Sequence, residues 1–499
     1  MQQIRSARGW FWRIWSIQTC MQATAEPKQV TGLGLDLTEA QAREIFRQGE
    51  EAVVFALLRQ AQLLAEAQQR AASAAHSVSP STPSGMQPVY TKPPTSSRRK
   101  RPGRKDGHAG AWRRQPEHAD QTQEHRLACC PYCQGELQRC QQVRRRYIED
   151  LPQDIRPVVT EHVIHRDWCP QCRKHVEPVV PDALPGAMLG HRVVALSAWL
   201  HYGLGQTLSQ IVEVFGHHLH LRLTPGGLMQ MWRRFGELLA GWYEQIHAQA
   251  RQAAALHADE TGWHVNGKTH WLWCFSTTRE TLYLIDRSRA GPALRKFFRE
   301  EFAGTLICDF WGAYNAVVSS RKQRCLVHLL RDLDYVETYR TLDQDWPAFA
   351  KTLRRLIGDG IRLWQRDAVL PEEYASRRAR LTARLRDLIA GTWTHPEARR
   401  LLKRLRRHHD ELFTFLDVPG VPFENNHAER AIRPAVIIRK NSQCNRSQRG
   451  AHTQALLMSV YRTLKQRGLP PIETMTHAIR TYLNTGQLPP LPTMAAAIG

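Results

Sequence analysis

Alternating apolar and polar residues predict β-strands in the middle of the chain, from about Leu256 onward. Residues 269–276 and 281–286 are rich in Trp, Tyr, Ile and Leu, and the polar segment 277–280 separates them. This pattern predicts a β-hairpin. A short apolar run at 305–308 predicts another buried strand, and we expect a further strand at 324–327.

Helical patterns lie on both sides of these strands. Residues 38–70 contain much Ala, Gln, Glu and Leu, no Pro and only Gly49, which predicts one helix. The spacing of its apolar residues fits either a short coiled-coil seam or packing on its own protein, and the residues concerned are Val54, Leu57, Ala61 and Leu64.

Further helical segments are expected nearer the carboxyl terminus. Residues 188–250 predict short helices followed by a longer one, which is compatible with a helix-turn-helix DNA reader. Residues 346–416 are dense in Arg and Leu and predict helices. The tail from 452 to 483 predicts two helices that are separated at Gly468-Leu469-Pro470-Pro471.

The charge balance favours a polyanionic partner. The 499 residues carry 69 Lys plus Arg against 46 Asp plus Glu, for a formal net charge of +23. Such an excess favours nucleic acid through phosphate contacts, ahead of anionic membranes and acidic proteins. The length suits two to four domains. No stretch approaches the apolar length that a membrane span needs, and residues 9–15 are too short and too charged, at Arg13, for a secretory signal.

A basic segment lies in a region that cannot form a core. Residues 73–110 are rich in Ser, Pro, Thr and Gly, which is typical of a linker, and we place the end of the linker at residue 124. We interpret six positive residues in this linker as a phosphate-binding arm, in preference to a solvated tail; they are Arg98, Arg99, Lys100, Arg101, Arg104 and Lys105.

Two Cys-x-x-Cys pairs, Cys130 with Cys133 and Cys169 with Cys172, predict a structural zinc site. Each pair presents two thiolates to one side of the ion, and four thiolates complete its tetrahedron. Strands at 143–149 and 157–165 are expected to form a hairpin between the pairs. Two alternative ligands stay open: Cys129 can bind zinc in place of Cys130, and His175 can bind it in place of one cysteine of the second pair. The use of cysteine for metal binding favours the cytoplasm.

Two aspartates lie where predicted buried strands end. Asp259 follows an apolar entry into the hairpin, and Asp309 follows the strand at 305–308. If the strands are neighbours, both carboxylates can share divalent cations. Taken alone, each Asp is more often a cap or a turn residue.

A third acid is expected on the helix that follows Asn425 and Asn426, either of which can cap it. Glu429 lies one turn inside this helix and is placed to face Arg433. A capped helix with an ion pair and a metal-binding Glu explain the pattern equally well. In the second interpretation, Arg430, Arg433 and Lys440 hold DNA phosphates.

Four ordered motifs together resemble the insertion-sequence 66 family of bacterial transposases. They are HADETGW at 257–263, CDFWGAY at 308–314, RCLVHLLR at 324–331 and ENNHAERAIRP at 424–434. The resemblance extends from about residue 38 nearly to the end of the chain. The cysteine pairs are similar to that family's zinc-binding domain, and residues 101–110 to its basic segment.

The resemblance implies a catalytic triad of Asp259, Asp309 and Glu429, with Mg²⁺ or Mn²⁺ as the catalytic ion and Zn²⁺ as a structural ion. It implies an α/β fold (multidomain α+β overall), in which a ribonuclease-H-like core carries a helical insertion. Glu424 departs from the Asp expected there and stays open as a rival third acid. The domains that we expect are 1–37, unassigned; 38–72, helical; 73–124, linker; 125–180, zinc-binding; 188–250, helical and DNA-binding; 253–345 with 417–450, catalytic core; 346–416, insertion; and 451–490, carboxy-terminal helices.

The expected activity is metal-dependent DNA cleavage and strand transfer at the ends of an insertion sequence. Water would attack phosphorus at the element end, and the freed 3′ hydroxyl would then attack target DNA. The alternatives are a ribonuclease-H-like nuclease without strand transfer and a zinc-dependent DNA-binding protein. The expected partners are element-end and target DNA, a second copy of the chain and proteins encoded by the same element, in the bacterial cytoplasm at the nucleoid.

Overall fold

The structure is a computed structural model that describes residues 39–61 and 116–493, apart from 48, 51, 55, 59–60, 139–142, 153, 341 and 367–368. The chain divides into two units, residues 1–78 and 79–499. In the described residues the fold is mixed α/β, as expected.

The first unit contains helix α1, Glu39–Arg47. The expectation of one helix over 38–70 is wrong at Gly49, whose backbone has a φ of 101°. Glycine adopts this conformation easily because it lacks a Cβ atom, and helical backbone requires a negative φ. Among the expected seam residues, Val54 and Leu57 are exposed, whereas Leu64 lies outside the described residues.

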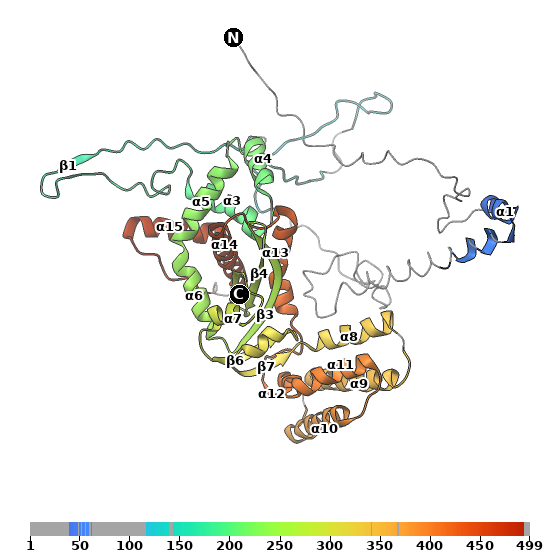
Figure 1. The fold of residues 1–499 in the computed structure, drawn as a ribbon. Helices are drawn as coiled ribbons and strands as arrows, with labels where there is room; N and C mark the ends of the chain where they lie inside the picture. Colours follow the sequence, from blue (N-terminus) through green and yellow to red (C-terminus); the bar gives the residue numbers. More distant parts are fainter. Residues whose placement is uncertain are drawn as a thin grey trace, which may run out of the picture. The chain divides into compact units, whose positions relative to one another are not determined.

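A five-stranded sheet forms the centre of the second unit (Figure 1). Its order is β5-β4-β3-β6-β7; β3 pairs antiparallel with β4 and parallel with β6. The bounds are β3 Ala255–Val265, β4 Lys268–Ser276, β5 Thr281–Asp286, β6 Phe302–Cys308 and β7 Ser319–Arg324. The predicted hairpin of β4 and β5 and the predicted strand at 305–308 are both confirmed.

The strand expected at 324–327 is displaced. Strand β7 ends at Arg324, and helix α8 begins at Leu326. All six residues of β7 are polar, and the strand lies at the edge of the sheet, so its sequence lacks the apolar alternation of a half-buried strand. The apolar residues after it instead form the buried face of α8.

Further helices of the second unit share one apolar core with strands of the sheet. They are α3 His191–Ala198, the π-helix η3 Trp199–Gly203, α4 Leu208–His218, α5 Pro225–Leu238, α6 Ala240–Arg251, α7 Gly291–Phe298, α13 Asn426–Ser442, α14 Gln448–Gln466 and α15 Pro471–Thr485. The predicted break in the tail is confirmed, since α14 ends at Gln466 and α15 begins at Pro471.

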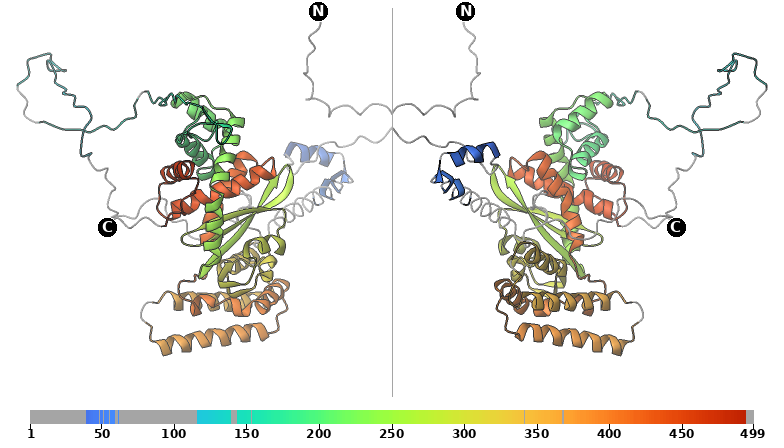
Figure 2. Two further views of the ribbon diagram at one scale, coloured as in Figure 1. Left: turned by 90° about the vertical axis from the view of Figure 1, so that its left-hand side faces the viewer. Right: turned by 90° about the vertical axis from the view of Figure 1, so that its right-hand side faces the viewer.

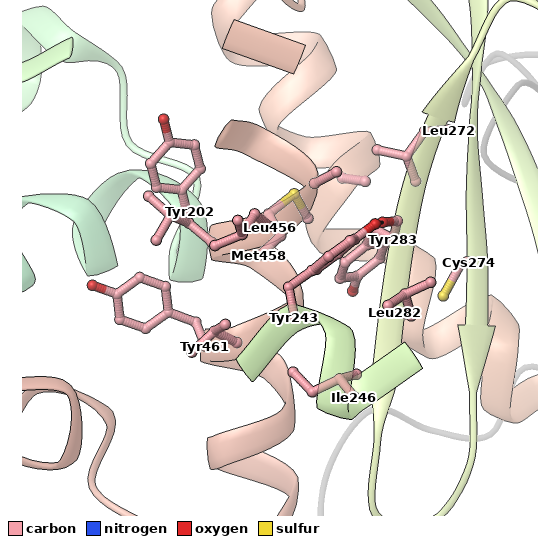
Figure 3. Packing of buried hydrophobic residues seen from close by; sticks show 14 of the residues in the cluster. Tyr202, Tyr243, Ile246, Leu272, Cys274, Leu282, Tyr283, Leu456, Met458 and Tyr461 are labelled. Carbon is pink, nitrogen blue, oxygen red and sulfur yellow. Dashed lines mark hydrogen bonds between the residues drawn. The ribbon is translucent and has the colours of Figure 1, made fainter. Parts of the chain in front are cut away.

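Helix α14 lies against β5 on one side and also contacts η3, α5 and α6, so it joins these helices to the sheet (Figure 3). Tyr461 donates a hydrogen bond to the Ala195 carbonyl at 2.6 Å, and Tyr243 donates one to the Tyr283 carbonyl at 2.8 Å. These buried hydroxyls are satisfied by backbone partners on other elements, so the helices pack in one arrangement on the sheet.

A second group of helices follows β7 (Figure 2). Its buried apolar residues form a core of their own. Its members are α8 Leu326–Tyr339, α9 Trp346–Trp364, α10 Pro371–Ala390, α11 Pro396–Arg407, the 3₁₀ helix η5 His409–Glu411 and α12 Thr414–Asp417. The elements from α9 to α12 occupy the segment expected to be an insertion. In the described part of the chain, we find no helix with the length and apolar character of a membrane span.

Candidate active site

Asp259 lies inside the long central strand β3, opposite Cys274 of β4. The segment forms a strand because nearly every side chain from Leu256 to Val265 is buried between the packing layers. We expected Asp259 at the end of a strand, but β3 continues past it and stays paired with β4. Only the pairing of β3 with β6 ends before Asp259. The last β3–β6 pair is His257 with Ile307.

Asp309 follows directly after β6 and continues the same register. Ala255 pairs with Thr305 and His257 with Ile307, so two further residues along each strand bring Asp259 level with Asp309. Side chains alternate between the two faces of a sheet, which places both aspartates on one face. The strand pairing alone therefore aligns two acids where β3 and β6 separate.

Glu429 approaches from helix α13, whose start is held against β3 by Asn425. The buried Asn425 amide donates a hydrogen bond to the Ala258 carbonyl at 2.8 Å, and its oxygen lies 3.0 Å from Nδ1 of His257. Asn425 is the amino-terminal cap residue of α13, but its side chain makes no capping hydrogen bond. The Asn425 side chain therefore does not cap the helix as expected. It links α13 to β3, the strand that carries Asp259.

The three acids influence one another electrostatically. Burial raises the pKa of Asp259 well above its ordinary value, and the nearby charges of Glu260, Asp309 and Glu429 raise it further. Burial and Glu260 raise the pKa of Asp309 to about 6, against the opposing influence of His328. Buried like charges of this kind are stabilised by a cation. Oxygen ligands are those that magnesium prefers, so the donor set fits a divalent metal.

The carboxylates do not meet around one point in this structure. Across the described ranges, no group of three His, Cys, Asp or Glu side chains is close enough to hold a metal ion. Glu429 instead forms an ion pair with Arg331, at 3.2 Å. The ion pair that we expected between Glu429 and Arg433 is not the one formed, because packing of α8 brings Arg331 to the carboxylate and Arg433 is exposed.

The rival acid Glu424 has a different environment. It precedes α13 and accepts a hydrogen bond from the side chain of Asn426. Glu429, and not Glu424, is among the main charges that raise the pKa of Asp259. Of these two acids, Glu429 is therefore the one whose charge acts on Asp259.

Two residues of α8 belong to this site and were missed as site residues in the sequence. Besides Arg331, His328 is buried, and its Nδ1 has no hydrogen-bond partner among the described residues. Burial lowers the pKa of His328, whereas the charges of Asp309 and Glu429 act in the opposite direction. The motif at 324–331 carried the signal, but its interpretation as a strand hid the helical spacing of positions 328 and 331.

A buried set of contacts supports the two aspartates from the other face. Glu260, fully buried, pairs with Arg289 at 3.0 Å and accepts a hydrogen bond from Tyr314 at 2.7 Å. Arg289 also lies over the ring of Trp311, at 3.8 Å from its centroid. The backbone nitrogen of Trp311 donates to Asp309 at 2.8 Å. Trp311 is thus fixed by protein contacts, as is Trp263, which is buried and donates to Asn445.

The residues that we expected to bind phosphate lie in two places, on α13 and in the linker. Arg430, Arg433 and Lys440 are all exposed. Their three- and seven-residue spacings place them on one face of α13. The basic segment lies outside the described residues; it contains Arg98, Arg99, Lys100, Arg101, Arg104 and Lys105.

Each cysteine pair has the local form of a metal-binding turn. Cys130 donates from its backbone nitrogen to the Gly135 carbonyl at 2.9 Å, and the Cys172 nitrogen lies 3.4 Å from the Cys169 sulfur. Hydrogen bonds from the second cysteine of each pair lower the pKa of the Cys130 and Cys169 thiols. Such turns favour the thiolate that binds zinc.

The two pairs do not converge into one four-cysteine site within the described residues. The strands expected at 143–149 and 157–165 are absent from those segments. The hairpin present is instead β1, Asp167–Cys169, with β2, Lys174–Val176, around the second pair. Apolar side chains in these segments are exposed, including Val143, Val158 and Val163, so no burial stabilises strands there.

Comparison with known proteins places these motifs in a family. A search among curated proteins gave no match. The family model described as "Transposase IS66 family" matches residues 186–453, which is more than half of the chain and includes Asp259, Asp309 and Glu429. The chain therefore belongs to the IS66 family of transposases.

Proposed function

We propose that this transposase cuts DNA at the ends of an insertion sequence and joins the freed 3′ ends to target DNA, at a site formed by Asp259, Asp309 and Glu429. The observation that carries the proposal is the shared register of β3 and β6, which aligns the two aspartates beside the start of α13. Membership of a transposase family already implies that the chain binds DNA.

The proposed catalytic core is ribonuclease-H-like. In support, β3 has an antiparallel neighbour, β4, on one side and a parallel neighbour, β6, on the other. A helical group with its own core lies in sequence between Asp309 and Glu429. The chain forms this helical group first, and α13, which carries Glu429, follows it and contacts β3.

Asp259, Asp309 and Glu429 would hold Mg²⁺ or Mn²⁺, which when bound stabilises the attacking and leaving oxygens during displacement at phosphorus. The protein's own contribution is the burial of the two aspartates, which makes their negative charges costly without a cation. Arg331 can bind either Glu429 or a substrate phosphate, because a guanidinium matches both. Arg430, Arg433 and Lys440 would hold the DNA backbone outside the cleaved bond.

We propose that the two cysteine pairs, Cys130 with Cys133 and Cys169 with Cys172, bind one structural Zn²⁺. The lowered thiol pKa values of Cys130 and Cys169 support this. The segment between the pairs has exposed apolar side chains, so metal binding would supply the energy that orders them. We further propose at least a dimer acting on paired element ends, with element-encoded accessory proteins, in the bacterial cytoplasm.

Cleavage of a supercoiled plasmid that carries the element's own ends tests the proposed chemistry. With magnesium, Asp259→Asn, Asp309→Asn and Glu429→Gln are each expected to lower product formation by roughly 10²–10³-fold, because each removes a negative charge from the site. Glu424→Gln is the matched control and should stay within about twofold of the wild type.

Three outcomes would change the proposal. Activity that survives Glu429→Gln but disappears in Glu424→Gln would move the third acid. Cleavage without any joined product would leave a nuclease. Wild-type protein that binds the ends but never cleaves them, with accessory proteins and either Mg²⁺ or Mn²⁺ present, would leave a DNA-binding protein.

A further inference from the structure

A groove rich in arginine lies between helices α9 and α10, within the helical group that follows β7. The two helices lie side by side (Figures 1 and 2). Their apolar faces share one core, which includes Leu353, Leu356, Leu381 and Leu385. Because this core fixes the helices, the positions of the arginines on their outer faces are also fixed.

The groove has a volume of about 590 Å³, and six of the side chains that line it are arginines. They are Arg355, Arg362, Arg366, Arg377, Arg380 and Arg384. The other lining residues are Asp359, Leu363 and Leu381, so one carboxylate faces six guanidinium groups. Arg355 and Arg362 also line an adjoining cavity of about 700 Å³, together with Lys351 and Arg354.

The acids on these helices do not neutralise the groove. Asp359 already pairs with both Arg362 and Arg384, and Glu373 pairs with Arg377. In the adjoining cavity, Glu337 pairs with Arg354. Arg355 and Arg380 are exposed and form no ion pair with any other residue that the structure describes.

Like charges held together in this way repel one another, at a cost that water and salt reduce but do not remove. Folding of the helices does not require this arrangement, because their core is apolar. The arginines are therefore best explained by a ligand with several negative charges. Guanidinium groups match phosphate oxygens in both charge and geometry.

The spacing along α9 suits an extended polyphosphate. The helix axis of α9 rises about 10 Å between Arg355 and Arg362, and a DNA strand presents one phosphate about every 3.4 Å along its duplex axis. A duplex lying along the groove would thus place several consecutive phosphates opposite the arginines. No apolar side chain is needed for such a contact, and the two leucines that line the groove belong to the floor or core of the helix pair.

We propose that the α9–α10 groove binds the sugar-phosphate backbone of duplex DNA, independently of base sequence, as a contact separate from the three acids. The proposal rests on the proposed function in that it identifies one more surface by which the transposase holds its DNA. Backbone contacts of this kind position a duplex and do not read its sequence.

The test compares Arg355→Ser/Arg380→Ser with the control Arg386→Ser/Arg407→Ser in the full-length chain. The control removes the same charge from exposed positions on α10 and α11 that do not line either cavity. Binding of a labelled duplex without element sequence is measured at several salt concentrations. The groove variant should bind about tenfold more weakly, and its slope of log K against log salt should be shallower by about 2, because each phosphate contact contributes about 0.9.

An unchanged affinity and salt slope in the groove variant would overturn the proposal, as would equal effects in the groove variant and the control. Loss of self-association with unchanged DNA binding would identify a protein partner and would also overturn it. Equal melting temperatures exclude unfolding as the cause. Plasmid cleavage by the same proteins separates the two proposals, because a wild type that never cleaves contradicts the catalytic function and leaves the binding result intact.

Discussion

Arg331 of α8 donates two hydrogen bonds to the Glu429 carboxylate of α13, at 3.2 and 3.3 Å. The pair joins the first helix after β7 to the helix that carries Glu429. The Glu429 side chain is only 13% exposed, whereas that of Arg331 is 38% exposed. A carboxylate this enclosed is stabilised by a neighbouring positive charge. Arg331 supplies that charge here, and a divalent metal bound to Glu429 would supply it as well.

Replacement of Arg331 tests this relationship. Arg331→Gln is expected to lower the free energy of unfolding of the metal-free protein by about 1–3 kcal/mol, because Glu429 loses its partner. Saturating magnesium should restore more stability to this variant than it adds to the wild type. Denaturant unfolding with and without magnesium measures both effects. Equal stabilisation of the two proteins by magnesium would mean that Arg331 and the metal do not compete for Glu429.

Asn425 is expected to hold α13 in place. Asn425→Ala removes the hydrogen bonds to Ala258 and His257 and should cost about 1–3 kcal/mol of stability, because it leaves buried polar groups unpaired. Cleavage should fall with it, since Glu429 would no longer be positioned.

The matched control for Asn425 is its neighbour. Asn426→Ala loses a hydrogen bond to Glu424 alone and should change stability by less than about 0.5 kcal/mol. Thermal unfolding and plasmid cleavage measure the two variants. If both behave alike, the connection between α13 and β3 is not what positions Glu429.

The ion pair of Glu411 with the fully buried Arg324 should make stability depend on acid pH. Although burial opposes ionisation, hydrogen bonds and charge from His408 and Arg324 lower the pKa of Glu411 from 4.5 to about 2. A lowered pKa in the folded state contributes stability above the unfolded value of 4.5, and that contribution is lost as the pH falls toward 2.

Glu411→Gln should therefore destabilise the protein by roughly 3 kcal/mol at pH 7, and by less than half of that at about pH 3. Urea midpoints of the wild type and the variant across this range provide the measurement. A difference that stays constant between these pH values would show that the effect of the substitution is steric and not electrostatic.

Zinc binding should depend on specific cysteines. We expect one Zn²⁺ per chain, lost in Cys130→Ser and in Cys172→Ser because each removes a thiolate ligand. Cys129→Ser and His175→Ala serve as controls and should retain the metal. Metal analysis of the purified protein measures its content, and hydrogen exchange of residues 143–179 should slow when zinc is added. Retention of zinc by Cys130→Ser, together with its loss in Cys129→Ser, would exchange the two ligands.

Local pattern in the sequence was sufficient for several elements. The hairpin of β4 and β5, the strand before Asp309 and the break between α14 and α15 were all predictable, because each depends on neighbouring residues. Apolar alternation, a buried run and a Gly-Pro interruption mark these elements. The motifs around Asp259, Asp309 and Glu429 likewise carried enough residues to predict the family that the comparison confirms.

Only the tertiary structure decided what these residues contact. Arg331 lies far from Glu429 in sequence, and the tertiary fold brings Arg331 of α8, and not Arg433, to the Glu429 carboxylate. Asn425 has the sequence of a helix cap, yet β3 offers its side chain a buried carbonyl. The polar edge strand β7 pairs through its backbone, which carries no side-chain signal. Sequence pattern records local periodicity, whereas these contacts depend on which distant elements folding brings together.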